Sequence, residues 1–469
     1  MTARALAIFE IISPGANFIF YTFIRWNTMK DWIEKHQISD VECIVPDMVG
    51  AACGKIMPAS KFAGDTVLRL PKAIFLQSVT GDYPKLFQKI NPLDVDMLLK
   101  PDSSTLRLLP WAREPSAQAI HDCFEMDGTP VDFAPRQVLR RVLDLYRAEG
   151  WKPVVAPELE FYLLQPNLDP KDALLPPVGR TGRAESPGQS FNISAVNEFG
   201  TMLEDLYEYC ESQQLKIDTL IHEEGQGQME INLVHGDPLD LADQAFLFKR
   251  TVREAALRHH LYATFMAKPV ANQPGSAMHI HQSVEDLETG RNIFSDDKGA
   301  PNELMLGHIA GLQQFMPDAM ALMAPYVNSY RRIVKEMSAP INFHWGFDNR
   351  TTGFRVPDND PASMRVENRI ASADVNPYLA IATSLACGYI GMKQKLRPTE
   401  AITGSAYHEP FQMSRHWYGA LEKLAGNAAL RDVLGGNFID IYVAIKEIEF
   451  DHFLNEISPW EREHLLLKV

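Results

Sequence analysis

The sequence lacks most of the short features that reveal a function directly. Its five cysteines are far apart and form no Cys-x-x-Cys pair, which argues against a zinc knuckle or a disulfide framework and fits a reducing, cytoplasmic compartment. Positive charge is scarce: 45 Lys and Arg face 60 Asp and Glu, for a formal net charge of -15. Nucleic acid and anionic membrane surfaces are therefore not expected partners.

Two further absences concern nucleotide binding and membrane insertion. No Walker-type or kinase-type glycine loop is present, so a bound nucleotide would have to be held by metal ions and arginines. Long apolar runs are also missing, because Glu10 and the Pro14-Gly15 pair interrupt the apolar N-terminal segment before it reaches signal or membrane-spanning length. We expect residues 1–27 to form a packed or frayed extension, and we assign it no function.

The 469 residues, 46% hydrophobic and 22% charged, have the composition of a globular protein of two or three domains. Residues 28–125 contain one clear helix, "MKDWIEKHQ", and short strand-like runs ("VECIVPD", "DTVLRL", "DMLLKPD", "STLRLLP"), which predicts a small β-rich domain. The helical pattern of "DFAPRQVLRRVLDLYRAEG" begins a second domain, predicted over residues 126–469. Its strands and helices alternate irregularly, unlike those of a doubly wound sheet.

Carboxylates recur on one face of predicted strands. In "PVVAPELEFYLL" the alternation puts Glu158, Glu160 and Tyr162 on one face and apolar residues on the other. In "EEGQGQMEINL" Glu223 and Glu230 are separated by a Gly-rich bend, and Glu230 shares a face with Asn232. Each pattern alone is also typical of a solvated polar face or a surface turn.

Two other strands carry complementary groups. "SAMHIHQSV" places His279, His281 and Ser283 on one face, either as a ligand pair or as two hydrogen-bonded histidines. "MRVENRI" places Glu367 between two arginines on one face, which cross-strand ion pairing alone could explain. Taken together, five glutamates and one histidine form a ligand set suited to Mg²⁺ or Mn²⁺, with room for two ions.

A basic segment accompanies these ligands. Residues 331–369 hold seven cationic side chains against five acidic ones, in a chain that is otherwise acidic: Arg331, Arg332, Lys335, Arg350, Arg355, Arg365 and Arg369. Arginines beside a magnesium site indicate bound phosphate, because planar guanidinium groups match phosphate oxygens.

Several motifs together resemble the glutamine synthetase superfamily from about residue 28 to the C-terminus: "DSSTLRLLPW", "PELEFYLL", "HEEGQGQMEINL", "GSAMHIHQS", "VNSYRR" and "RVENRIASADVNPYLA". The resemblance implies an α+β fold, with a β-grasp-like N-terminal domain and a catalytic domain built on a curved antiparallel sheet flanked by helices. It also implies a homo-oligomer, a dodecamer of two stacked hexamers with active sites between subunits. The expected substrates are L-glutamate, ATP and an amine.

The same resemblance assigns roles residue by residue. One metal ion would be held by Glu160, Glu223 and Glu230, and the other by Glu158, His279 and Glu367. ATP would contact His281, Ser283, Arg355 and Arg365, whereas Arg350 would act on the transferred phosphoryl group. Glutamate would be held by Arg332, Arg369 and the backbone at Gly275, with Arg332 also counted as catalytic.

The sequence departs from ammonia-using glutamine synthetases where the amine is selected. Ser338 stands at the position of the flap glutamate, and Gln77-Ser78 replace a second expected acid, although Glu336 and Asp82 are close in sequence. "WGFDNRT" resembles the γ-glutamyl-polyamine synthetase branch, which joins glutamate to putrescine and related amines during their breakdown. Phe343 and Trp345 are candidate walls of the amine pocket next to Ser338, with core packing as the alternative for both rings.

Other functions stay open. They are an ammonia-dependent glutamine synthetase, a γ-glutamyl ligase for a monoamine or amino alcohol, and a catalytically silent homologue. Ala277 and Ala362 replace family residues near the nucleotide, which leaves details of its binding open.

Overall fold

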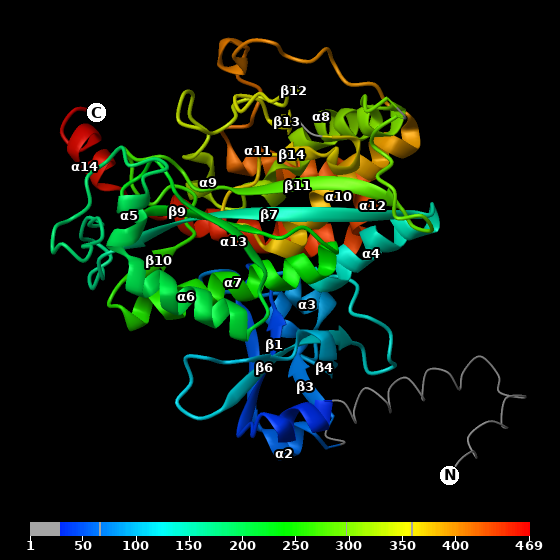
Figure 1. The fold of residues 1–469 in the computed structure, drawn as a ribbon, viewed down its shortest axis with the longest axis vertical. Coiled ribbons are helices and arrows are strands. Elements are labelled where there is room, and N and C mark those ends of the chain that lie inside the picture. The colour runs from blue at the N-terminus through cyan, green and yellow to red at the C-terminus, as the bar shows by residue number, and fades with distance from the viewer. Residues whose placement is uncertain (1–28, 65–66, 297, 358–359) are drawn as a thin grey trace, which may run out of the picture.

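The computed structural model describes residues 29–469 apart from residues 65–66, 297 and 358–359, so the predicted extension over residues 1–27 lies outside the described part. The chain builds two β-sheets, the first at the bottom of Figure 1 and the second above it, among most of the helices. The first sheet ends at Phe124 and the second begins at Trp151.

The first sheet has six strands in the order β2-β1-β6-β4-β3, with β5 paired to β6. Their bounds are β1 (Asp40–Pro46), β2 (Ala52–Pro58), β3 (Leu68–Pro71), β4 (Asp96–Pro101), β5 (Arg107–Leu108) and β6 (Ser116–Phe124). Strands β1 and β6 run parallel, and the other pairs are antiparallel. The predicted helix is confirmed over residues 29–35, and two short helices, α2 (Ala59–Phe62) and α3 (Phe87–Ile90), are added to it.

Two expectations for this region were wrong. The predicted strand "STLRLLP" begins in a 3-10 turn (Ser103–Thr105), because the Asp102 carboxylate accepts a hydrogen bond from the Ser104 amide (3.0 Å) and bends the chain. Only Arg107–Leu108 is extended. The nine-residue β6 was missed: it is buried on both faces, so it shows no alternation of polar and apolar residues.

The second sheet has eight strands in the order β12-β13-β14-β11-β7-β9-β8, with β10 paired to β7. They are β7 (Trp151–Leu164), β8 (Ile217–His222), β9 (Gln228–Leu233), β10 (Tyr262–Thr264), β11 (Met278–Asp286), β12 (Trp345–Phe347), β13 (Phe354–Val356) and β14 (Val366–Asn368). All pairs are antiparallel, as expected, except β12 and β13, which run parallel at one edge of the sheet.

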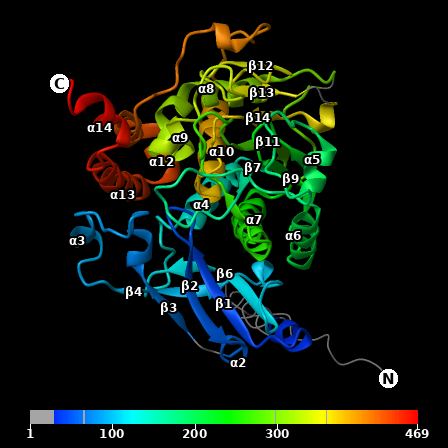
Figure 2. The same ribbon diagram turned by 90° about the vertical axis from the view of Figure 1, so that its left-hand side faces the viewer.

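Eleven α-helices follow β6 in the described part of the chain. They are α4 (Pro135–Ala148), α5 (Ile193–Glu198), α6 (Gly200–Ser212), α7 (Pro238–Arg258), α8 (Glu303–Met323), α9 (Val327–Tyr330), α10 (Pro377–Gln394), α11 (Trp417–Gly426), α12 (Ala428–Leu434), α13 (Gly436–Leu454) and α14 (Pro459–Leu465). Helices α4 and α7 contact β7 and α10 contacts β11, which closes the core under the sheet (Figures 1 and 2). Within the described part of the chain, no helix is both long and apolar enough to cross a membrane.

Helix α10 lies at the centre of this core and is buried along almost its whole length, as its apolar sequence predicts. Asn376 caps its start, accepting hydrogen bonds from the amides of Tyr378 (3.0 Å) and Leu379 (3.4 Å). Helix α8 approaches it closely, because a Cβ on Gly311 would lie 2.1 Å from the Cys387 carbonyl oxygen. Only glycine permits this contact.

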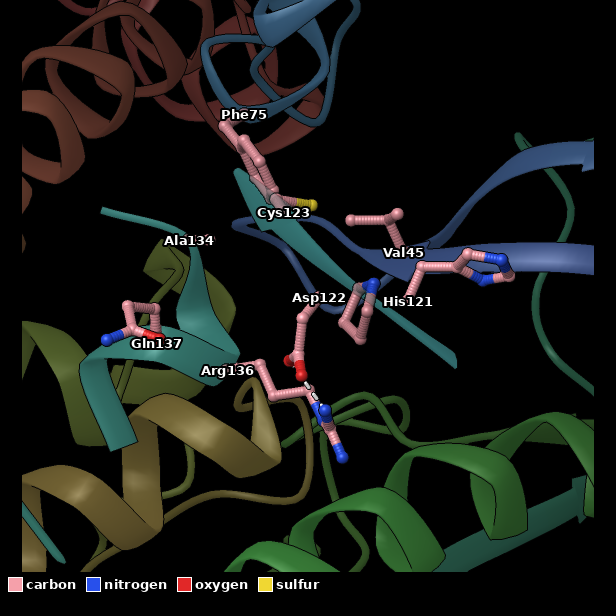
Figure 3. Close-up of a pocket in the computed structure, with 9 residues that line it drawn as sticks. Val45, Phe75, His121, Asp122, Cys123, Ala134, Arg136 and Gln137 are labelled. Atoms are coloured by element: carbon pink, nitrogen blue, oxygen red, sulfur yellow. Dashed lines mark hydrogen bonds and ion pairs between the residues drawn. The ribbon is translucent and has the colours of Figure 1, made fainter. Parts of the chain in front are cut away.

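A buried ion cluster joins the two sheets. Arg136, near the start of α4, contacts Asp102 (2.8 Å) and Asp122 (2.6 Å) from the first sheet region and Asp243 (2.7 Å) from α7. Figure 3 shows Arg136 beside Asp122, at a small pocket of about 10 Å³ that Phe75, His121 and Cys123 also line. The space is about that of one water molecule, so the pocket is a packing feature of the junction.

Candidate active site

Four adjacent strands, β9, β7, β11 and β14, present acidic and histidine side chains on one face of the second sheet. Strand β7 lies between β9 and β11, and the strand register pairs Glu160 with Glu230, Glu158 with His279 and, through β14, His281 with Glu367. The alternate residues of β7 are fully buried in the core: Leu159, Phe161 and Leu163. The predicted alternation of faces is therefore confirmed, and it brings four of the six predicted metal ligands close to one another: Glu158, Glu230, His279 and Glu367.

The candidate metal-ligand atoms form two groups, which differ from the two predicted sets. Within each group the donor atoms lie within 4.8 Å of one another. The first group is Glu158, Glu230 and His279, and the second is Glu158, His281 and Glu367. Glu160 stands apart from both groups because its Oε2 accepts hydrogen bonds from the Ala277 amide (2.9 Å) and the Gln228 side chain (3.3 Å). Glu223, half-buried just after β8, also belongs to neither group.

The carboxylates of this cluster shift one another's pKa values. Burial and then repulsion from Glu158 and the other glutamates raise the pKa of Glu230 to about 10, and burial together with Glu223 raises the pKa of Glu160 to about 8. Burial opposes ionisation of Glu367 as well, but Arg369 and the two histidines outweigh it and lower its pKa to about 2. Such a crowd of buried acids is suited to a cation of more than one charge.

His279 provides the clearest sign of a metal site. Its Nδ1 lies 3.2 Å from Glu158, and its buried Nε2 has no hydrogen-bond partner among the described residues. If Nδ1 carries the proton and donates it to Glu158, the Nε2 lone pair is left to face a ligand. Burial and the nearby Arg369 lower the pKa of His279 to about 4, so the ring is neutral, as a metal ligand must be. The residues present therefore fit Mg²⁺ or Mn²⁺.

Arginines surround the cluster on the side of β13 and β14. Arg355 contacts Glu367 (2.7 Å) and Asp348 (2.6 Å), Arg369 also pairs with Glu367, and the Arg365 Nε lies 3.1 Å from Nδ1 of His281. Three of the four residues predicted to contact ATP thus lie together, and the half-buried Ser283 follows on the same face of β11.

The residues predicted to hold glutamate are also neighbours. The guanidinium of buried Arg332 donates to the carbonyl oxygens of Ile370 (3.0 Å) and Arg369 (3.1 Å), and burial lowers its pKa to about 10. Gly275 lies against its stem: an added Cβ would come within 2.5 Å of the Arg332 Cγ and 2.7 Å of the Ala267 carbonyl oxygen. Glycine at residue 275 therefore leaves room for the arginine.

Other predicted residues lie outside this cluster. Arg350 is exposed in the turn after β12, and Ser338 is exposed with a left-handed backbone (φ +57°). Phe343 and Trp345 are each 95% buried, and the Trp345 indole donates to the Thr399 carbonyl oxygen (2.7 Å). Both rings are thus packed as the alternative reading describes, and neither offers an open face.

One residue of the site was missed by sequence reasoning. Glu185 lies in the long loop between β7 and α5, and its carboxylate contacts the His222 Nε2 (2.7 Å) and the Gly227 amide. His222 in turn contacts the Glu223 carbonyl oxygen through Nδ1 (2.6 Å). Glu185 therefore holds both ends of the turn that carries Glu223, and no periodicity or motif in its loop indicates this role.

The fold and the site together identify the class of protein. The model of the glutamine synthetase catalytic domain matches residues 132–465. The chain belongs to the glutamine synthetase family. It is an enzyme of the glutamate–amine ligase type, which forms a carbon–nitrogen bond, and the family generally uses ATP and divalent metal ions.

Its relatives differ in the amine they are named for. The chain is 34% identical to gamma-glutamylputrescine synthetase PuuA of Escherichia coli (93% of this chain, 94% of the relative) and 31% identical to glutamate–isopropylamine ligase of a Pseudomonas species (92% and 96%). It is 29% identical to the glutamine synthetase of Methanocaldococcus jannaschii (93% and 97%). A solved complex of GmaS with ADP superimposes with a TM-score of 0.79 at 25% identity, covering 93% of this chain and 99% of that one.

Proposed function

We propose that this enzyme joins the γ-carboxylate of L-glutamate to a primary amine of a diamine or polyamine, such as putrescine, in the breakdown of these amines. The observation that carries the proposal is the residue at the flap position: Ser338 is exposed, points from a left-handed turn and brings no carboxylate. An enzyme that selects ammonium needs a negative charge close to that small cation. The likeness to gamma-glutamylputrescine synthetase supports the same conclusion.

The reaction would proceed in two steps. The glutamate γ-carboxylate oxygen attacks the γ-phosphorus of ATP, ADP leaves, and a γ-glutamyl phosphate forms. The amine nitrogen then attacks the acyl carbon, the carbon–oxygen bond to phosphate breaks, and the nitrogen releases one proton. Phosphorylation supplies the leaving group that a free carboxylate lacks. Arg350, with Arg332, would stabilise the charge on the transferred phosphoryl group.

The ligands of the metal ions would be five glutamates and one histidine: Glu158, Glu160, Glu223, Glu230, Glu367 and His279. When bound, Mg²⁺ or Mn²⁺ would neutralise phosphate charge and orient the nucleotide. His281, Ser283, Arg355 and Arg365 would contact ATP, as expected from their common face beside Glu367.

Glutamate would lie between Arg332 and Arg369. Both guanidinium groups are buried, and the Arg369 Nε has no hydrogen-bond partner among the described residues, which leaves a donor for a substrate carboxylate. The close approach of Gly275 to Arg332 would fix the distance between this arginine and the substrate.

Two parts of the proposal concern the organisation of the chain. Residues 28–125 would form the β-grasp-like domain and residues 126–469 the catalytic domain, and active sites would lie between subunits of a dodecamer made of two stacked hexamers. Light scattering that gave an active monomer would contradict the shared site.

The test is phosphate release with ATP and glutamate across a panel of amines at equal free-amine concentrations. We expect some diamine or polyamine to be used at least about tenfold faster than ammonia, or about 1.4 kcal/mol of transition-state binding. Ser338→Glu should narrow this ratio. A preference for ammonia would indicate a glutamine synthetase, and equal use of isopropylamine would favour a monoamine ligase.

A further inference from the structure

A second cavity, of about 650 Å³, lies away from the carboxylate cluster, and none of the predicted metal ligands lines it. Five segments of the chain meet there: the loop before α3, the segment after β10, α9 with the residues that follow it, the start of α11 and the end of α13. Its lining includes Val79, Met266, Lys268, Arg331, Val334, Met337 and Phe453.

The walls of this cavity are largely apolar and open to solvent. Val79, Met266, Val334 and Phe453 have exposed fractions between 39% and 57%, although each is a large hydrophobic residue. Exposed apolar side chains that gather around one hollow, rather than being scattered, are typical of a binding site.

The charges of the cavity are predominantly positive. The ammonium of Lys268, a residue only 7% exposed, donates to the Gln273 carbonyl oxygen and lies 3.8 Å from the Met337 sulfur, and burial lowers its pKa. Neither Lys268 nor exposed Arg331 pairs with a carboxylate of the described residues. The acid in the wall, Glu449, is already neutralised by Lys446 (2.8 Å) and accepts the Val79 amide (2.9 Å).

We propose that this cavity binds a small organic anion with an apolar body, such as an aliphatic carboxylate. The carboxylate would lie between Lys268 and Arg331, which supply the positive charge that no protein acid balances, and the chain would lie against Val334 and Phe453. A cationic amine would be repelled by these two charges.

The position of the cavity suggests that it regulates the active site. Its wall includes the segment from Arg331, which precedes Arg332, to Met337, which lies between two residues of left-handed backbone, Glu336 (φ +62°) and Ser338 (φ +57°). A ligand bound in the cavity would hold this segment in the conformation that leaves Ser338 exposed. Because Ser338 is proposed to border the amine pocket, we expect the ligand to inhibit the ligase reaction. This coupling rests on the proposed function, whereas binding itself does not.

Calorimetry with sodium octanoate tests the binding, on the whole protein without ATP, glutamate or metal ions. We expect octanoate to bind at least about tenfold more tightly than octylamine. Arg331→Gln should weaken octanoate binding about fivefold or more, whereas Lys335→Gln, which removes an equal charge four residues on and outside the lining, should change it less than about twofold. Both side chains are exposed, so both variants should fold.

Absent octanoate binding, equal binding of octylamine, or equal effects of the two variants would each overturn the proposal. Val334→Asp, which adds a negative charge to the wall, should weaken octanoate binding as well, and unchanged binding would contradict the assigned position. Inhibition of wild type but not of Arg331→Gln would support the coupling, and binding without inhibition would refute the coupling alone. Failure of the amine assay would leave the calorimetry unaffected.

Discussion

The crowded carboxylates make a prediction about stability that is separate from catalysis. Glu230→Gln removes one acid from the cluster and keeps its size. Without divalent ions the variant should be more stable than wild type, because wild type keeps a buried acid among like charges. With excess Mg²⁺ the order should reverse, since wild type alone retains the full ligand set.

The size of the first effect follows from the pKa of Glu230. Burial raises this pKa from 4.5 to about 10, so between these values the folded protein binds one proton that the unfolded chain has lost. Stability of the metal-free protein therefore falls as pH rises, by about 1.4 kcal/mol per pH unit. From about pH 4.5 to pH 7 the loss of stability amounts to roughly 3 kcal/mol. This value is an upper bound, because the neighbouring acids titrate together. A glutamine at residue 230 does not titrate, so the variant lacks this pH-dependent loss.

Chemical denaturation with a chelator and with excess Mg²⁺, at several pH values, measures both effects. Glu285→Gln is the matched control: it also lies on the second sheet, but it is paired with Lys152 (3.1 Å) outside the cluster. We expect the control to follow wild type under both conditions. If Glu230→Gln were less stable than wild type even with chelator near pH 7, the inferred repulsion within the cluster would be wrong.

Three further changes test other parts of the site and fold. Gly275→Ala should raise the KM for glutamate at least about tenfold, because the new Cβ would displace Arg332, and should leave the KM for ATP almost unchanged. Steady-state kinetics measures both constants, and equal rises in the two KM values would contradict the assigned role of Arg332. Arg136→Met should lower the free energy of unfolding by about 3–5 kcal/mol, since it leaves the buried carboxylate of Asp243 without its cation, whereas Arg140 still pairs with Asp102 and Asp122. A loss below about 1 kcal/mol in denaturation would contradict a stabilising role for this ion cluster. Glu185→Ala should weaken Mg²⁺ binding in calorimetry about tenfold or more while circular dichroism is unchanged, and unaltered affinity would count against its positioning of Glu223.

The strands of the site could be predicted from the sequence because an alternating strand has a fixed geometry. Once "PELEFYLL" is recognised as a strand with a buried face, Glu158 and Glu160 have to share the other face. The pairing of Glu160 with Glu230 and of His281 with Glu367 depends on the order of the strands as well, which alternation does not give; the family resemblance implied only that these residues share one site.

The features that sequence reasoning missed depend on tertiary contacts. Glu185 acts through a loop with no regular pattern, and β6 is hidden by burial on both faces. The observed division of ligand atoms into two groups differs from the predicted one, since it depends on rotamers such as that of Glu160 toward the Ala277 amide. Period and composition do not determine contacts of this kind.

The placement of residues explains how one family can use different amines with the same phosphoryl chemistry. The candidate ligands of metal, ATP and glutamate lie on paired strands or are tied to them, as Arg332 is through the carbonyl oxygens of Arg369 and Ile370. Ser338 and Glu336 instead lie in an exposed turn, where a substitution disturbs no strand pairing and no core contact. If the enzyme has the proposed amine specificity, a change in such a turn is enough to alter the amine: the absence of one carboxylate there would remove the attraction for ammonium, while the residues proposed to activate glutamate would stay intact.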